Sequence, residues 1–464
     1  MKKIKVLLGL VLSAATGLSH AQQKYELSVK EAVDLAYKNV IQVKNAQIDH
    51  RIQEAKNREI LGQAYPQLTG NANATHYLKL PGFLFPDATS TAVYSILKNE
   101  GVSGSAGPIT DVPAPTLTQV SFQQPWNLTA GATLSQLLFQ PDVFVGLQAR
   151  ETALNLTASQ VESIKETVKD SAYKRYYAIL ISQKQLDFLN QGLERLRKLY
   201  YDDSIMYVNG FAEKLELDKV QVQINNLTTT RNQVAAGITM AYAGLKFALG
   251  ISQKDTVVLR DELTSASIRD NLLDTAFRYE DRPEIRTLDY VKQLQELDVK
   301  RYRLSYIPTV AAQANYSING LGQKFFTHSS TAWIRSAFIG INIDVPIFDG
   351  FQRRYRIQQA RLRLEQAENN ITNLKQGIDV EQVITRQTLL TAISNLDIQE
   401  SNMQLAEKVY NTTKLKFEQG VETSSFEVIL AQSDLLTSQS NYFTALYNAV
   451  IARISYLRSL GKLQ

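Results

Sequence analysis

The spacing of apolar residues changes abruptly at two places in the chain. In "INIDVPIFDGFQRRYRIQQA" (341–360) the large aliphatic residues alternate up to Val345 and recur every three or four residues after Asp349. In "LSQLLFQPDVFVGLQA" (134–149) the same change occurs about two hundred residues earlier. Alternation is typical of a half-buried strand, and a spacing of three or four is typical of an amphipathic helix. The pattern therefore predicts that a strand leads directly into a helix at both places.

The proline positions indicate where helices can be very long. Residues 142–282 and 347–464 contain no proline, and proline interrupts a helix because it lacks the N–H group and its ring clashes with the preceding turn. We expect a helix over 349–417, roughly 100 Å long at 1.5 Å per residue. Its apolar positions recur at spacings of three and four and drift slowly against a seven-residue repeat, as in helices that pack along their length. These positions are Ile357, Ala360, Leu364, Ala367, Ile371, Leu374, Ile378, Leu389, Ala392, Leu396, Met403, Ala406, Tyr410 and Phe417.

The two halves of the chain carry the same landmarks. Pro66 and Pro308 are 242 residues apart, whereas Gly210 and Gly420 are 210 apart. The difference indicates that the first half has an additional segment, 81–125, which is rich in proline and glycine. Each half is therefore predicted to contain a helix, two strands, a very long helix, a turn and a return helix.

The expected boundaries follow from these landmarks. The first repeat, 22–250, comprises a helix over 28–64, strands over 66–80 and 126–140 around the long loop 81–125, a long helix over 142–207 and a return helix over 212–249. A linker over 251–270 precedes the second repeat, 271–464, with a helix over 271–306, strands over 308–319 and 333–347, the long helix over 349–417 and a return helix over 422–460. Ser28, followed by Glu31, predicts a capping box at the first helix. The "RPEI" stretch (282–285) predicts a kink in the helix 271–306.

The predicted strands have one apolar face and one polar face without charges. "PTVAAQANYSI" and "WNLTAGATLSQLL" both alternate in this way. Each strand is long enough to cross an outer membrane, for which about 9–11 tilted residues suffice. Four strands cannot close a barrel, and each unpaired backbone group at an open edge in hydrocarbon costs several kcal/mol. The fold expected is therefore mainly α with membrane β, in which three chains share a twelve-stranded barrel that continues into a long α-helical barrel.

The two tryptophans, Trp126 and Trp333, stand at the start of the second strand of each pair. Tryptophan is enriched at membrane–water interfaces, so both are candidate membrane-interface anchors. The alternative is that both are buried core residues.

Export is indicated by the first 21 residues. "MKKIKVLLGLVLSAATGLSHA" has three lysines, an apolar stretch and a small-x-small end, which is the pattern of a secretory signal peptide over 1–21. Without those lysines the formal net charge of +5 falls to about +2, which argues against nucleic acid as a partner. The absence of cysteine excludes disulfides, thiolate metal sites and a lipid-modified cysteine anchor.

The chain offers no helix that clearly suits a membrane span. The stretch 234–251 has 18 residues and contains Lys246, whereas a span needs about 20 apolar residues. Its alanine and glycine content favours close helix packing instead.

No pattern in the chain indicates an enzyme. His50, His76 and His328 are isolated from one another and from other metal-ligating residues. "GVSGSAG" (101–107) lacks the lysine of a phosphate-binding loop. We therefore expect no catalytic site, no cofactor and no metal.

Four duplicated motifs resemble the outer-membrane efflux family, of which TolC is the best-known member. They are "SQLLFQP" and "DVPIFDG" at the strand-to-helix joints, and "MYVNGFAEKLELDKVQ" and "LKFEQGVETSSFEVILAQ" at the helical turns. The resemblance covers essentially the whole mature chain. It implies a homotrimer with a twelve-stranded barrel in the lipid of the bacterial outer membrane and a large helical part in the periplasm.

The resemblance also implies a function. Such a channel is the passive exit duct of a tripartite efflux or type I secretion system, docked on a periplasmic adaptor (membrane fusion) protein and an inner-membrane pump, which largely sets the cargo. The alternative from another class is a soluble periplasmic coiled-coil scaffold, in which the strand pairs would be small capping sheets.

The same resemblance places the periplasmic tips at Gly210 and Gly420. Glu216 stands where the family carries an acidic tip residue, and Glu427 is its counterpart in the second half. Three copies of these two carboxylates around one axis would form rings that favour cations. The alternative is that both are solvated carboxylates at helix starts, where the helix dipole favours them.

Two further residues belong to the predicted tip. Phe417 occupies the position of an aromatic residue in the family. Glu422 stands where TolC has a basic residue, which speaks against an aromatic–arginine latch of the TolC type.

Overall fold

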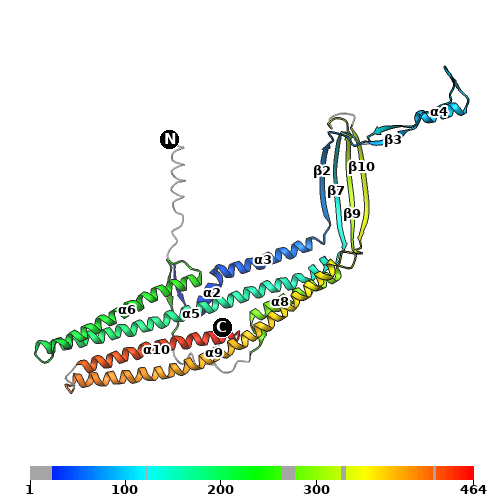
Figure 1. Ribbon diagram of the computed structural model, residues 1–464. Coiled ribbons are helices and arrows are strands. Elements are labelled where there is room, and N and C mark those ends of the chain that lie inside the picture. Colours follow the sequence, from blue (N-terminus) through cyan, green and yellow to red (C-terminus); the bar gives the residue numbers. More distant parts are fainter. Residues whose placement is uncertain (1–22, 122, 263–276, 326–330, 422–424, 464) are drawn as a thin grey trace, which may run out of the picture. The chain divides into compact units, whose positions relative to one another are not determined.

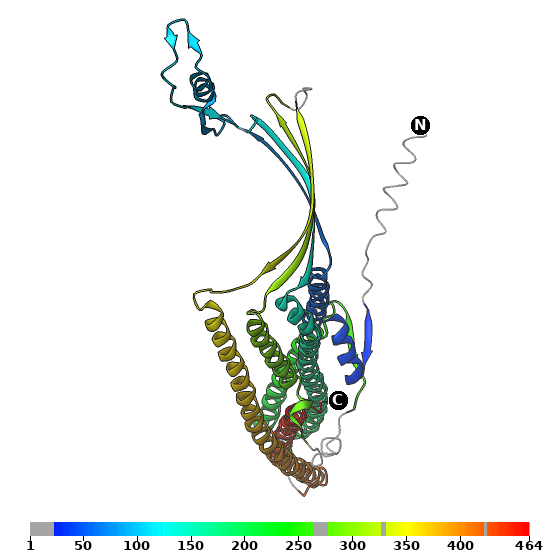
Figure 2. The same ribbon diagram turned by 90° about the vertical axis from the view of Figure 1, so that its right-hand side faces the viewer.

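The computed structural model describes residues 23–121, 123–262, 277–325, 331–421 and 425–463 (Figure 1, turned by 90° in Figure 2). The predicted signal peptide, 1–21, and Glu422 lie outside these residues, as does His328. Most described residues are helical.

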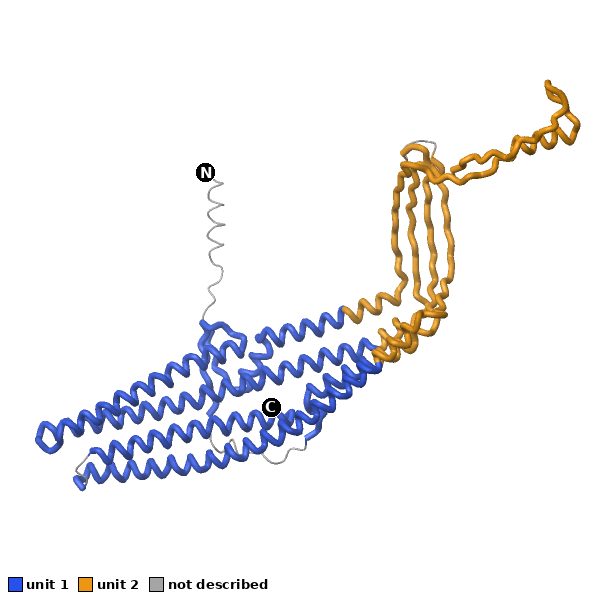
Figure 3. Tube along the Cα trace, viewed as in Figure 1, with its two compact units in different colours: residues 1–55, 149–296, 361–464 blue, residues 56–148, 297–360 orange. Residues whose placement is uncertain are grey.

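The chain divides into two compact units (Figure 3). Unit 1 comprises residues 1–55, 149–296 and 361–464, and unit 2 comprises residues 56–148 and 297–360. Both halves of the chain contribute to each unit.

Unit 1 contains two long helical hairpins. α5 (Pro141–Val208) turns back into α6 (Lys214–Leu249), and α9 (Gln352–Glu418) turns back into α10 (Ser425–Ser459). The first residues of α5 and of α9 belong to unit 2. The inward positions predicted for α9 are all buried or partly buried, so the period read from the sequence is confirmed. In the described part of the chain, no helix combines the length and apolar character needed to cross a bilayer.

Smaller elements complete unit 1. They are β1 (Lys24–Leu27), α2 (Val29–Asn39), most of α3 (Ile41–Gly62), β8 (Thr256–Leu259), the 3-10 turn η1 (Tyr279–Asp281) and most of α8 (Pro283–Leu304). β1 and β8 pair in parallel. The fully buried Tyr176 of α5 donates its hydroxyl to the Leu27 carbonyl oxygen at 2.8 Å and ties this sheet to the helices. The segment 251–270 was predicted to be a linker, but it contains the strand β8. Its partner strand, β1, lies more than two hundred residues away in the chain, so no local pattern indicates the pairing.

The opening helix differs from its predicted course over 28–64. The capping box of Ser28 and Glu31 is confirmed, but the helix breaks at Val40, which is extended with φ −63° and ψ 125°. The break lies against the end of α6, where a Cβ on Gly250 would come within 2.8 Å of the Asn39 carbonyl carbon. Glycine at position 250 is therefore what permits the close approach of these two chain segments.

The corresponding helix of the second half starts later than predicted. The stretch 271–276 lies outside the described residues, and α8 begins only at Pro283. The predicted kink at 282–285 is therefore a helix start, which suits proline in the first turn. A Cβ on Gly461 would come within 2.8 Å of the Asp281 carbonyl oxygen, just before α8. In the first half, Gly250 lies in the same way against Asn39, just before α3.

Unit 2 is built on a four-stranded antiparallel sheet with the order β10-β9-β7-β2. The strands are β2 (Gln67–His76), β7 (Trp126–Phe139), β9 (Thr309–Gly322) and β10 (Ala332–Asp344). The strand predicted over 66–80 thus spans only Gln67–His76, four residues short of the predicted end. Figure 2 shows the pronounced twist of the sheet. β2 and β10 are its two edges.

The segment predicted as the loop 81–125 has structure of its own, and we call it the arm. It contains β3 (Phe83–Asp87), α4 (Thr89–Asn99), β4 (Ser103–Gly104), β5 (Gly107–Pro108) and β6 (Thr116–Val120). β3 pairs with β6, and β4 pairs with β5, both antiparallel.

The two strand-to-helix joints are not alike. Only Gln140 separates β7 from α5, whereas the seven residues 345–351 separate β10 from α9. Gly350 and Phe351 in this second joint are left-handed, with φ 64° and φ 66°. Asp349 accepts a hydrogen bond from the Arg353 N–H group at 2.9 Å. The prediction that strand and helix join directly was therefore wrong for the second half.

Candidate functional site

One face of the sheet in unit 2 is polar and almost free of charge. The register aligns its hydroxyl and amide side chains in rows: Thr69, Asn71, Asn73 and Thr75 on β2; Asn127, Thr129, Thr133 and Ser135 on β7; Gln313, Asn315, Ser317 and Asn319 on β9; Ser336 and Asn342 on β10. Arg335 and Asp344 are the only residues of the Asp, Glu, Lys and Arg types in these four strands. Asp344 lies on this face and Arg335 on the opposite one, and β10 also places Ile334 and Phe338 on the polar face.

Neighbouring strands are linked by hydrogen bonds on this face. The Thr129 hydroxyl donates to Asn319 Oδ1 at 2.9 Å, and Asn315 Nδ2 donates to Thr133 Oγ1 at 2.8 Å. Such side chains offer both donors and acceptors to water without a fixed field. The surface can therefore contact water and polar solutes of either charge.

The opposite face of the sheet is mostly apolar and exposed, and Arg335 is its charged residue. Ile339 and Ile341 on β10 are 88% and 67% exposed, and Leu68 on β2 is 72% exposed. A contiguous exposed apolar surface on this scale marks a contact with lipid or with another protein. The strand alternation predicted from the sequence is confirmed by the register.

The tryptophans lie at one end of the sheet, and the register places both on this apolar face. The Trp126 ring stacks on His76 with 4.2 Å between ring centroids. The exposed Trp333 lies across Gly320 of the neighbouring strand, where a Cβ would come within 2.9 Å of its ring. Neither residue belongs to the buried core of the described residues.

The turns at the far ends of the hairpins in unit 1 have the same geometry. Gly210 and Gly420 are left-handed, with φ 80° and φ 70°. In the first turn the Phe211 N–H group donates to the Met206 carbonyl oxygen at 2.8 Å. In the second turn the corresponding bond, from Val421 to Lys416, is 3.0 Å. Each helix therefore ends in a Schellman motif, which satisfies its last carbonyl groups.

The predicted tip residues occupy different environments. Glu216 lies half-buried in the first turn of α6, and Glu427 lies exposed in the first turn of α10. Phe417 packs, partly buried, against an apolar cluster formed by Leu199, Val220, Tyr410, Val428, Ile429, Ala431 and Leu435. This cluster joins α5, α6, α9 and α10 near the turns.

A buried carboxylate that the sequence does not mark lies beside the tip residues. Asp203 of α5 is 1% exposed and lies beside the buried hydroxyl of Ser425. Burial raises the pKa of Asp203, the Ser425 hydroxyl lowers it, and the carboxylates of Glu216 and Asp202 raise it further. Three acidic groups therefore act on one another at this turn, and one of them is held out of water.

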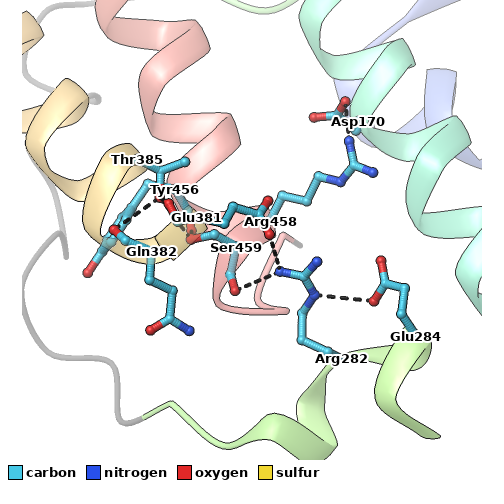
Figure 4. A network of polar contacts seen from close by, with 9 residues as sticks. All are labelled: Asp170, Arg282, Glu284, Glu381, Gln382, Thr385, Tyr456, Arg458 and Ser459. Atoms are coloured by element: carbon cyan, nitrogen blue, oxygen red, sulfur yellow. Dashed lines mark hydrogen bonds and ion pairs between the residues drawn. The ribbon is translucent and has the colours of Figure 1, made fainter. Parts of the chain in front are cut away.

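A network of polar side chains holds four helices of unit 1 together (Figure 4). The buried Arg282, just before α8, contacts Glu284 at 3.2 Å and Glu381 of α9 at 3.1 Å, and it donates to the Ser459 carbonyl oxygen at the end of α10 at 2.9 Å. Burial lowers the pKa of Arg282, but the two carboxylates outweigh it and the net shift is upward. Figure 4 shows the guanidinium aimed at these three partners.

The fourth helix joins the network through Asp170 of α5. Its Oδ2 contacts Arg458 of α10 at 3.0 Å, and its Oδ1 contacts Lys174 at 2.9 Å (Figure 4 shows the former). A sequence reading missed Arg282 and Asp170, because a charged residue becomes conspicuous only when its burial is known. The network is structural in character, since its charged groups pair with one another across helices.

The geometry of the described residues offers no catalytic arrangement. In the ranges that the structure describes, no group of three or more His, Cys, Asp or Glu side chains could hold a metal ion. His50 contacts the Thr157 hydroxyl at 2.9 Å, and His76 stacks on Trp126.

Comparison with known proteins gives a consistent result. Residues 281–462 match the family model described as "Outer membrane efflux protein". The chain is 22% identical over 348 residues to the outer membrane efflux protein BepC of Brucella suis, covering 72% of each chain.

Solved structures with the same fold are also found. CusC aligns with a TM-score of 0.71 at 15% identity, covering 96% of this chain and 95% of that chain. VceC of Vibrio cholerae aligns with a TM-score of 0.67 at 14% identity, covering 93% and 96%. The open state of MtrE of Neisseria gonorrhoeae aligns with a TM-score of 0.66 at 12% identity, covering 94% and 89%.

Proposed function

We propose that the chain is a member of the outer membrane efflux protein family, whose model matches residues 281–462, and that three copies form the outer-membrane exit duct of a tripartite efflux or type I secretion system. The observation that carries the proposal is the four-stranded sheet with one polar, almost uncharged face, one exposed and mostly apolar face, and two open edges.

The open edges support a shared barrel. β2 and β10 each have one side without a partner strand within the described chain. In hydrocarbon such an edge costs several kcal/mol for each unpaired backbone group. Pairing β10 of one copy with β2 of the next would close a ring, and three copies would supply twelve strands.

The two faces support the orientation of that barrel. The apolar face, with Leu68, Ile339 and Ile341, would contact lipid, and the polar face would line the channel. An outward apolar band and a polar interior are the pattern of outer-membrane barrels. Trp126 and Trp333, on the apolar face, would then be anchors at one membrane–water interface.

The helices would extend the duct into the periplasm. α5 and α9, with their return helices, would form the α-helical barrel, and the turns at Gly210 and Gly420 would be its periplasmic tip. Glu216, Glu427 and Phe417 would line or support the narrowest part. The tip would dock on a periplasmic adaptor protein, which connects it to an inner-membrane pump that supplies the energy.

Extraction from cells tests this function. An exit duct should stay with the outer membrane until detergent is added, and its mass in detergent should be that of three chains. Release of monomers by osmotic shock would favour the alternative, a soluble periplasmic coiled-coil scaffold. Reconstituted trimers should also conduct ions across a planar lipid bilayer, whereas a scaffold should not.

A further inference from the structure

The arm, residues 81–125, carries a large apolar surface and no core. None of its described residues is buried. Its two ends are held together, because the Tyr77 N–H group donates to the Pro125 carbonyl oxygen at 2.8 Å and the Ser121 hydroxyl donates to the Pro81 carbonyl oxygen at 3.1 Å. A two-stranded ribbon of this kind is marginally stable in water when nothing covers it.

The ribbon of β3 and β6 carries exposed apolar side chains on both faces, among polar ones such as Gln119 and Thr118. The register puts Leu84, Pro86 and Leu117 on one face, and Leu84 and Leu117 are 66% and 67% exposed. The other face carries Phe83 and Val120, which are also exposed. A ribbon that only had to lie on a surface would need one apolar face, so a ribbon with two needs a neighbour on each side.

The helix of the arm adds to this surface. Val93 and Ile96 of α4 are 48% and 62% exposed, and α4 has no buried residue. Exposed apolar area of this kind marks an interaction site.

The charge of the arm helps to choose its partner. The arm contains one basic residue, Lys98, and three acidic residues, Asp87, Glu100 and Asp111, so its formal charge is about −2. Anionic lipid surfaces attract basic segments rather than acidic ones. A phosphate-rich membrane surface is therefore disfavoured as the partner.

We propose that the partner is the same arm in the sister copies, and that the three arms pack side by side into a closed collar. This inference rests on the proposed trimer. In a ring each copy has two neighbours, and the contact is heterologous, so that one face of a subunit meets the other face of the next. The arm leaves the sheet directly after β2, an edge strand that would adjoin the next copy. The two apolar faces of the ribbon match the two neighbours.

Introduced cysteines test the collar, since the native chain has none. Leu117→Cys and Val120→Cys place one thiol on each face of β6. The double variant is treated in detergent with a short bismaleimide. It should give covalent trimers on a denaturing gel. The reason is that each contact joins the thiol at position 117 of one copy to the thiol at position 120 of the next. Either single variant should stay monomeric on the gel, because like faces do not meet.

Controls separate this inference from the proposed function. A variant with both thiols at the β4–β5 turn, Ser105→Cys with Ala106→Cys, should give far fewer trimers. A double variant that has the mass of a trimer in detergent but does not cross-link would overturn the collar and leave the channel intact. A monomeric mass would overturn the channel itself. Dimers in the single variants would mean that like faces meet, and cross-links to a foreign protein would mean that the apolar faces bind another partner. Either result would overturn the collar.

Discussion

At the residue scale, the most informative side chains are charged groups held away from water. Arg282 and Asp170 pair with groups on other helices, whereas Asp203 is buried beside the tip, and burial raises its pKa. Burial disfavours the charged form of a carboxylate. We therefore expect ionised Asp203 to weaken the turn region and the paired Arg282 to strengthen the middle of the helical unit.

Replacing Asp203 with asparagine should stabilise the protein at neutral pH. The pKa of Asp203 is raised in the folded state above its ordinary value of 3.8. The buried charge therefore lowers the stability of the fold at pH values above the folded pKa. This loss of stability disappears as the pH falls through the folded pKa towards 3.8. We expect Asp203→Asn to raise the midpoint of thermal unfolding at pH 7, and this gain to shrink as the pH approaches 4. Circular dichroism at several pH values measures it. Asp202→Asn, on a less buried neighbour, is the control; an equal gain there would contradict the role of burial.

Removing Arg282 should cost stability. Arg282→Ala leaves Glu284, Glu381 and the Ser459 carbonyl group without their donor. We expect a loss of about 1.5–3 kcal/mol, the range for hydrogen bonds to charged groups. Arg278→Ala, which removes a guanidinium that is 75% exposed, should change little. Urea unfolding of both variants decides the matter, and equal midpoints would show that the network adds no stability.

At the scale of elements, helix ends and strand faces carry most of the argument. The glycines at positions 210, 250, 420 and 461 are all left-handed, and each follows a helix. They end the long helix and the return helix of both halves in the same way. The duplicated order of elements thus extends to the backbone conformation of the turns.

Two glycines in or beside α9 should respond to alanine with opposite signs. Gly420 is left-handed and Gly377 lies within the helix, and a Cβ would meet nothing within 4 Å at either position. Alanine at 420 should cost about 1–2 kcal/mol through backbone strain, and alanine at 377 should gain about 0.5–1 kcal/mol. Hydrogen exchange in the last turn of α9 should rise for the first variant and not for the second. Unchanged exchange in Gly420→Ala would mean that the turn can adopt another conformation.

The two faces of the sheet should tolerate charge differently. Gln313 on β9 lies on the polar face, and Ile339 on β10 lies on the apolar face. Gln313→Lys should leave the trimer intact and shift its ion preference towards anions, because three positive charges would then line the channel. Ile339→Lys should cost up to about 2–4 kcal/mol for each copy placed in lipid and reduce the amount of trimer. The amount of trimer in membrane fractions measures the effect of Ile339→Lys, and the reversal potential measures the effect of Gln313→Lys. If both variants gave the same amount of trimer, the assignment of the two faces would be contradicted.

At the scale of the whole molecule, the proposed function needs three copies. A single chain has a sheet with two open edges and an exposed apolar face. Closure of the sheet, a lipid-facing surface and a common axis for the tips all follow from one assembly. The collar of arms would depend on the same symmetry.

Rings of carboxylates at the tip should set ion preference. Three copies of Glu216 and Glu427 would place six negative charges around the axis of the proposed trimer. Replacing both with alanine should lower the preference for cations, because the favourable potential at the constriction is lost. Reversal potentials in a salt gradient measure this. An unchanged potential would mean that these carboxylates are solvated groups at helix starts.

Features that depend on near neighbours in the chain could be predicted from the sequence. The three-to-four spacing of α9, the alternation in β7 and β9 and the Ser28–Glu31 cap are each encoded within one or two turns or strand repeats, and all were predicted correctly. Periodicity is read locally because side chains that share a face of one element are close in the chain.

Tertiary structure alone decided the features that depend on distant partners. The break at Val40 against Gly250, the pairing of β8 with β1 and the left-handed joint at Phe351 were not foreseen. The buried positions of Asp203 and Arg282 were not foreseen either. Each depends on a contact or a burial that no local spacing reveals, because the cost of a charge or of a bend is set by what the folded chain brings against it.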